Sequence, residues 1–370
     1  MSDAESLGLL AAIAAIPTAP FHENDVAAFV ARYIRNLGVP LTVDPYGNLI
    51  ATYQNGDSRR PIAFVAHLDH PAIEITEVQS TTTARAALLG GVPAACFERP
   101  VPVSLFTRAG SISAVIVGRN VNPADGRVAS LAIECAGGCQ VGDWGVFDLS
   151  PFAIHGNRVD LRAADDLAGV AAALEALREI VASRVPGTAY GVFTRAEEVG
   201  LVGAALVAEQ RLLPPDTIVV SLECSRALPG AEIGAGPVIR VGDRTGAFHP
   251  DGEALLLAGR DRIKETLVQR QLMSGGTCEA TAFIRAGYRA TGIALPLGNY
   301  HNVGPTNLIE PEYIDRGDFL AEIRLLVAAT WAASERLVAA TGMPAAPIEL
   351  HRQRLMATAS FFLPLTQPST

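Results

Sequence analysis

Two hydrophobic patterns alternate along most of the chain. Short, largely apolar runs at residues 61–66, 188–193, 217–222 and 288–297 have the composition of buried parallel strands. Helical patterns fill much of the sequence between and around them, at residues 7–16, 23–37, 167–183 and 200–207. This alternation predicts an α/β domain with a mixed, mostly parallel sheet sandwiched by helices.

Other segments depart from this alternation. Residues 41–44 and 48–52 flank a Pro-Tyr-Gly turn and predict a hairpin. Residues 74–157 contain short β-like runs separated by turn signals, which predict a small inserted β-barrel or sandwich, with the barrel preferred. The expected organisation is an α/β domain formed by residues 1–73 and 158–345, an insert at 74–157 and an unassigned tail at 346–370. Residues 311–341 are expected to form one long closing helix.

Composition narrows the class of protein. The chain has 370 residues, of which 49% are hydrophobic and 18% charged, as in a globular protein with a large core. Its net charge of -9 argues against nucleic acid or an anionic membrane as a partner. No run approaches the roughly 20 apolar residues of a membrane helix. The acidic start and five scattered cysteines favour a cytoplasmic protein.

Potential metal ligands follow several of the predicted strands or begin the helices after them. They are His67, Asp165, the pair Glu197-Glu198, Glu223 and His301. Each has an ordinary structural explanation when taken alone, for example a helix N-cap or a surface histidine. Together they offer the nitrogen and oxygen donors that suit zinc, manganese or cobalt. The carboxyl ends of strands in an open α/β sheet are also where ligands bind.

A pair of metal ions accounts for the whole set. Asp165 is the candidate bridge, because one carboxylate can contact two ions about 3.5–4 Å apart. His67 and Glu223 would complete one site, and Glu198 and His301 the other. The two sites leave room for a shared water, whose pKa the cations would lower toward neutrality.

Two further residues have expected roles beside these ligands. Glu197 adjoins a ligand without being one, so it is placed to take a proton from the water and pass it to a leaving amine. Asp69 lies two residues after His67 and could accept a hydrogen bond from the second imidazole nitrogen, which would fix the ring.

Several motifs resemble the co-catalytic dinuclear-zinc exopeptidases, and most closely the glutamyl/deblocking, or tetrahedral, aminopeptidases. They are His67-Leu68-Asp69, Asp165-Asp166, Glu197-Glu198-Val199-Gly200-Leu201, Gly275-Gly276-Thr277 and the late His301. The resemblance covers about residues 5–340. It implies a zinc-exopeptidase, or phosphorylase/hydrolase-like, fold and two zinc ions, with cobalt or manganese as alternatives. It also implies a cis peptide between Asp165 and Asp166, a short peptide as substrate and a homo-oligomer assembled through the insert.

The sequence also departs from this family at several positions. Leu167 stands where an arginine usually follows the paired aspartates, and Cys278-Glu279 replaces an aspartate. Tyr300-His301-Asn302 aligns with the family motif only to within one residue. His70 replaces a family glutamate. These changes bear on substrate preference and assembly more than on metal binding.

The function that we expect is a metal-dependent aminopeptidase acting on short peptides. A metallo-deacylase or carboxypeptidase acting on N-acylated amino acids or dipeptides could use the same centre, since related amidohydrolases often have a glutamate at the position of Glu223. A glycoside hydrolase using Glu197 and Glu198 is less favoured, because adjacent side chains are poorly placed to flank a glycosidic bond. A non-catalytic scaffold would not need all of the expected site residues.

Overall fold

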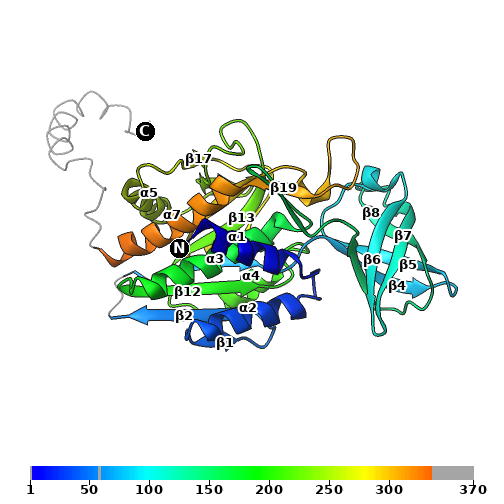
Figure 1. Ribbon diagram of the computed structural model, residues 1–370, viewed down its shortest axis with the longest axis horizontal. Helices are drawn as coiled ribbons and strands as arrows, with labels where there is room; N and C mark the ends of the chain where they lie inside the picture. Colours follow the sequence, from blue (N-terminus) through cyan, green and yellow to red (C-terminus); the bar gives the residue numbers. More distant parts are fainter. Residues whose placement is uncertain (1, 57–59, 336–370) are drawn as a thin grey trace, which may run out of the picture. The chain divides into compact units, whose positions relative to one another are not determined.

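The computed structural model describes residues 2–56 and 60–335, which belong to one compact unit (Figure 1). The helices are α1 (Asp3–Ala14), α2 (Asn24–Asn36), α3 (Ala164–Ala182), α4 (Val202–Glu209), α5 (Pro250–Arg262), α6 (Glu279–Arg285) and α7 (Arg316–Ser334), with 3-10 turns η1 (Ala94–Phe97) and η2 (Tyr300–Asn302). The strands before α3 are β1 (Leu41–Val43), β2 (Leu49–Asn55), β3 (Ile62–His67), β4 (Ala72–Val78), β5 (Thr83–Leu89), β6 (Val101–Thr107), β7 (Gly110–Val121), β8 (Val128–Cys135), β9 (Trp144–Phe147), β10 (Phe152–His155) and β11 (Arg158–Leu161). Those after it are β12 (Gly187–Thr194), β13 (Ile218–Arg226), β14 (Val238–Arg240), β15 (Gly242–Asp243), β16 (Gly246–Ala247), β17 (Gln269–Gln271), β18 (Arg289–Leu297) and β19 (Glu312–Asp315).

An eight-stranded sheet forms the centre of the α/β part, in the order β1-β2-β12-β3-β13-β18-β14-β17. Its middle strands, β12, β3, β13 and β18, are parallel, and β2 and β14 pair antiparallel to them on either side. All six residues of β3 are buried, as expected for a strand covered on both faces. The predicted hairpin is present as β1 and β2.

Helices cover both faces of this sheet, as the sequence predicts. On one face, Ala63 and Val65 of β3 pack with α4 and α6 in a hydrophobic cluster that includes Val207 and Phe283. Because side chains alternate along a strand, the residues between them face the side contacted by α3. Helix α3 is buried along nearly its whole length and packs on α1 and α7. Between Leu167 and Leu174 it is buried and apolar on every side, as expected for a helix segment enclosed by other elements.

The predicted insert is a closed antiparallel barrel of strands β4-β5-β8-β7-β6-β9, coloured cyan to green in Figure 1. Alternate residues of its strands are buried, for example Val101, Val103 and Leu105 of β6. These side chains fill the barrel together with Phe97 and Phe147. Closing the sheet leaves no unpaired edge in the barrel, which is how small antiparallel sheets avoid exposed strand edges.

Two expectations about secondary structure are corrected. Residues 311–341 do not form one helix, because β19 pairs with β11 and α7 begins only at Arg316. Asp315 caps α7 by accepting hydrogen bonds from the backbone N–H groups of Gly317 and Asp318, which places the helix start there. Glu223 does not end its strand, since β13 continues to Arg226. The predicted tail at 346–370 lies outside the described residues.

Candidate functional site

Neighbouring strands of the central sheet bring the predicted residues to one edge. His67 is the last residue of β3, and its backbone pairs with the last residue of β12. Glu197 and Glu198 follow β12 in the turn that leads to α4. Glu223 lies near the carboxyl end of β13, and His301 lies in η2, just after β18. Residues separated by more than 200 positions therefore meet at the carboxyl edge of the sheet.

Asp165, in the first turn of α3, lies between two imidazole rings. Its Oδ1 is 3.5 Å from Nε2 of His67, and its Oδ2 is 3.7 Å from Nε2 of His301. Potential ligand atoms of His67, Asp165 and Glu223 lie within 4.8 Å of one another, as do those of Asp165, Glu198 and His301. The two groups share Asp165, and they contain the same residues as the two sites expected from the sequence.

The unpaired atoms of this centre fit bound cations. Nε2 of His67, Nε2 of His301 and Oε1 of Glu198 are buried and have no hydrogen-bond partner among the described residues. Buried polar atoms are normally paired, so several unpaired nitrogen and oxygen atoms converging at one place form a site suited to a cation. Imidazole nitrogens and carboxylate oxygens suit zinc, cobalt and manganese. Each group of three residues could hold one ion.

The electrostatics of the centre point the same way. Burial by itself lowers the pKa of His67, but the nearby carboxylates of Asp165 and Asp69 outweigh it and raise that pKa well above its usual value. Burial likewise lowers the pKa of His301, and Glu198 and Asp165 raise it well above normal. Burial raises the pKa of Asp165, yet the two histidines hold it below its usual range. The buried carboxylates thus favour positive charge among them.

Asp69 makes different contacts from those expected. Nδ1 of His67 lies 3.1 Å from the carbonyl oxygen of Asp69 and 3.6 Å from its carboxylate. The carboxylate instead accepts hydrogen bonds from the backbone N–H groups of Glu197 and Glu198, each at 3.0 Å. The expected imidazole contact is therefore made by the main chain, while the Asp69 side chain holds the turn that carries both glutamates.

Glu197 lies at the edge of the centre, with Oε2 4.0 Å from Nε2 of His67. Burial raises its pKa well above the ordinary value; His67 opposes this rise, while Glu223 and Glu198 add to it. A carboxylate whose pKa is raised accepts a proton at near-neutral pH more readily than an ordinary one. Glu197 is thus suited to proton transfer.

Glu312 is a residue of the site that the sequence did not single out. Its Oε2 accepts hydrogen bonds from the backbone N–H groups of Ala164 and Asp165, at 2.7 and 3.0 Å, and its Oε1 accepts one from His301 at 2.7 Å. One buried carboxylate thus holds two of the predicted ligand segments. The sequence offered no signal for it, because residues 311–341 were expected to be helical.

His70 also belongs to the surroundings of the site. Its ring is buried, with Nδ1 2.6 Å from the carbonyl oxygen of Asp165 and Nε2 2.9 Å from Oδ1 of Asn302. His70 therefore connects the segments that carry Asp165 and His301. The peptide between Asp165 and Asp166 is cis, as the resemblance implies.

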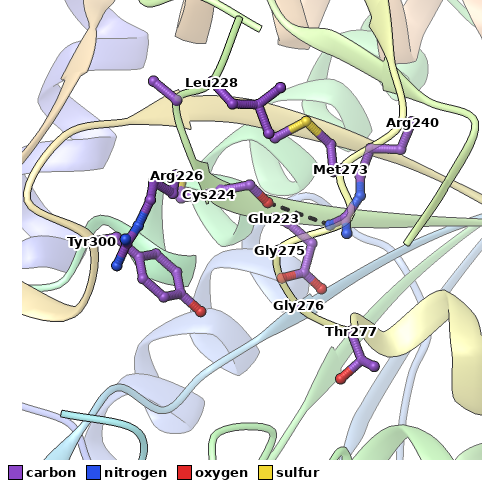
Figure 2. A pocket seen from close by; sticks show the side chains of 12 residues that line it. Glu223, Cys224, Arg226, Leu228, Arg240, Met273, Gly275, Gly276, Thr277 and Tyr300 are labelled. Carbon is purple, nitrogen blue, oxygen red and sulfur yellow. Dashed lines mark hydrogen bonds between the residues drawn. The ribbon is translucent and has the colours of Figure 1, made fainter. Parts of the chain in front are cut away.

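A cavity of about 280 Å³ adjoins the centre at Glu223 (Figure 2). Met273 and Leu228 contribute apolar wall, and Arg240 and Tyr300 contribute polar groups. Arg240 is only 2% exposed, and one of its nitrogens lies 3.4 Å from Oγ of Ser225. Its Nε is buried without a hydrogen-bond partner among the described residues. The cavity thus contains an incompletely paired cation close to the carboxylate of Glu223.

The family model for M42 glutamyl aminopeptidases matches residues 47–308, well over half of the chain. The chain belongs to this family. It is therefore a peptidase. This confirms the expectation from the sequence that the chain is a hydrolase of peptide bonds. Among the described residues, no helix has the length and apolar character needed to cross a membrane.

Individual relatives agree with this assignment. A putative aminopeptidase of Acetivibrio thermocellus is 24% identical over 82% of this chain and 93% of its own. The TET1 peptidase of Pyrococcus horikoshii, described as able to assemble into a tetrahedron or a large octahedral shell, is 23% identical with a TM-score of 0.74, over 89% of this chain and 99% of its own. The aminopeptidase APDkam598 of Desulfurococcus kamchatkensis is 24% identical, also with a TM-score of 0.74, over 92% of this chain and 99% of its own. The M42 peptidase thus has the same fold as these solved structures.

Proposed function

We propose that this M42 peptidase is an aminopeptidase that removes N-terminal residues from short peptides and depends on two divalent metal ions. Zinc is the proposed metal, and cobalt or manganese would fit the same donors. The observation that carries this proposal is the position of Asp165 between Nε2 of His67 and Nε2 of His301, neither of which has a hydrogen-bond partner among the described residues. His67, Asp165 and Glu223 would hold one ion, and Asp165, Glu198 and His301 the other.

When bound, such ions polarise a scissile carbonyl and lower the pKa of a water molecule toward neutrality. Glu197 would take the proton from the attacking water and deliver it to the leaving amine. Asp69 would position Glu197 through the backbone hydrogen bonds of its turn. Glu312 would keep Asp165 and His301 at their mutual distance. Precise placement of this kind can be worth several kcal/mol of the barrier.

We also propose that the enzyme prefers an acidic N-terminal residue. The cavity beside Glu223 is large enough for one side chain, and Arg240 offers it a buried guanidinium. Such a group pairs well with a carboxylate. The description of the family as glutamyl aminopeptidases agrees with this preference.

Assembly into a homo-oligomer in the cytoplasm completes the proposal. It is supported by the TET1 peptidase, for which tetrahedral and octahedral assemblies are described. Val78, Val117, Val121 and Val141, in or beside the barrel strands, are exposed and could be covered in such an assembly. The five cysteines are all free, which suits a reducing compartment.

The test is hydrolysis of a free-amine dipeptide and of its N-acetylated form before and after metal chelation. We expect hydrolysis of the free-amine substrate only, lost with the chelator and restored by zinc, cobalt or manganese. Glu197→Gln should lower kcat by about 10²-fold or more, as expected when a proton-transfer group is lost, while metal content is unchanged. Glu209→Gln, at an exposed position of α4, is the matched control.

Three results would count against parts of this assignment. Full activity of Glu197→Gln would exclude Glu197 as the base. Preference for the acetylated substrate would favour the deacylase alternative. Activity that survives complete metal removal would exclude the metal-dependent mechanism.

A further inference from the structure

Tyr300 lies where the cavity meets the candidate metal centre. It begins η2, immediately before His301, and its ring stacks on that imidazole with centroids 3.8 Å apart and planes 23° apart. The guanidinium carbon of Arg226 is 5.6 Å from the centroid of the same ring. These contacts fix the ring on the backbone turn that carries a predicted ligand.

The hydroxyl group of Tyr300 points into the cavity. Figure 2 shows it directed toward the side on which Glu223 lies, and both residues line the cavity. No hydrogen bond to this hydroxyl occurs within residues 2–56 and 60–335. By contrast, the hydroxyls of Tyr33, Tyr53 and Tyr288 donate to Glu175, Val185 and Leu213, respectively, at 2.7–2.8 Å. The donor of Tyr300 thus remains available to a molecule in the cavity.

The location of the cavity determines which part of a peptide would meet this donor. If the first side chain enters the cavity toward Arg240, the adjoining carbonyl would lie on the side nearest the metal centre, which Glu223 and Tyr300 line. During hydrolysis that carbonyl oxygen gains negative charge. A fixed, neutral donor then forms a stronger hydrogen bond in the transition state than in the ground state, and so raises kcat more than it affects binding.

We propose that Tyr300 is a catalytic residue whose hydroxyl donates a hydrogen bond to the oxygen of the scissile carbonyl as the tetrahedral intermediate forms. This inference rests on the proposed aminopeptidase function. The phenol keeps its proton throughout, so the step involves no proton transfer from Tyr300. The competing possibility is that the hydroxyl binds the first side chain of the substrate and acts on specificity alone.

Tyr300→Phe tests the proposal, because it removes only the hydroxyl and keeps the ring that stacks on His301. The zinc-loaded variant and wild type are compared on glutamyl and alanyl p-nitroanilides. We expect kcat to fall by about 10- to 100-fold on both substrates, near the lower end of the loss seen for a single oxyanion donor, with KM changed less than about twofold. Affinity for a dipeptide phosphonate, which carries a tetrahedral anionic centre, should fall by a similar factor.

Tyr53→Phe is the matched control. It also removes one tyrosine hydroxyl, which donates to the carbonyl of Val185 and does not line the cavity, so kcat should be unchanged. Metal content and thermal unfolding of both variants are measured alongside. An unchanged kcat for Tyr300→Phe, or a loss confined to the glutamyl substrate, would overturn the catalytic role. If wild-type protein hydrolyses no peptide, the proposed function fails and this inference with it. If wild type is active and the variant equals it, only the inference fails.

Discussion

Glu23 and Arg195 form an ion pair, with Oε2 of Glu23 2.7 Å from a terminal nitrogen of Arg195 and 2.8 Å from its Nε. Glu23 is fully buried, and its other oxygen accepts a hydrogen bond from the backbone N–H of Ala196 at 3.0 Å. Ala196 has φ +54°, a conformation unusual for a residue other than glycine. The pair therefore holds the turn immediately before Glu197 in a shape that it would not adopt readily by itself.

Glu23→Gln should displace this turn and lower kcat by about tenfold or more, because small misplacements of a catalytic group are costly. Metal content should be unchanged, since Glu23 contacts none of the proposed ligands. Steady-state kinetics and metal analysis measure the two effects. Glu77→Gln is the control, as it breaks only an exposed pair with Arg85 in the barrel and should have little effect. Wild-type kcat in Glu23→Gln would show that the pair does not position Glu197.

Arg240→Met should weaken the proposed preference for acidic N-terminal residues. A charge-assisted hydrogen bond contributes about 1.5–3 kcal/mol, so the ratio of kcat/KM for glutamyl over leucyl substrates should fall by about 10- to 100-fold. The ratio is the informative quantity, because Arg240 also faces Glu223 and its loss could lower all activities. Arg244→Met, at an exposed position, should leave the ratio unchanged. If the ratio is unaltered in Arg240→Met, then Arg240 does not determine the preference for the N-terminal residue.

Gly203 lies against the backbone of Arg195, in the turn that precedes Glu197. A Cβ at this position would lie 2.4 Å from the carbonyl oxygen and 2.6 Å from the nitrogen of Arg195. Gly203→Ala should therefore lower the free energy of unfolding by about 1–3 kcal/mol and also reduce activity. In Gly8→Ala the new methyl meets nothing within 4 Å on an exposed part of α1, so stability should be unchanged or rise by about 0.5–1 kcal/mol. Thermal unfolding of the two variants measures this difference. Equal stabilities of Gly203→Ala and Gly8→Ala would contradict the prediction.

Glu322 of α7 is expected to make the stability of the fold depend on pH. It is fully buried, neither carboxylate oxygen has a hydrogen-bond partner among the described residues, and burial, with Asp318 adding, raises its pKa well above normal. The folded state therefore binds this proton more tightly than the unfolded state. Stability should fall as pH rises above about 4.5, by up to roughly 1.4 kcal/mol per pH unit, until the folded pKa is reached.

Glu322→Met removes the buried carboxyl and should weaken this dependence. We expect the variant to unfold at a higher temperature than wild type at pH 8, with a smaller difference at pH 5, in scans of the metal-loaded proteins. Glu265→Met, at an exposed position, is the control and should leave the pH dependence unchanged. Parallel pH profiles for Glu322→Met and wild type would show that Glu322 is not the source of the effect.

Much of the fold followed from local pattern. The apolar runs before His67 and Glu197 predicted strands because strands covered on both faces are hydrophobic throughout. The turn signals after His70 predicted the barrel, since short strands with frequent turns close antiparallel sheets. The segment beginning at Pro311 was misread, because the short strand before α7 is defined by its pairing with β11 rather than by its own composition.

The sequence by itself determined which residue types follow the strands, and these include a set of imidazoles and carboxylates that suit divalent metal ions. Only the tertiary structure decided how these groups are held. Glu312, Glu23 and the carboxylate of Asp69 act through backbone N–H groups of segments far away in the chain. Apart from the Arg195 side chain that pairs with Glu23, the partners in these contacts are main-chain atoms, which every residue possesses. Such contacts leave no mark in the order of residue types and become visible only when the chain has folded.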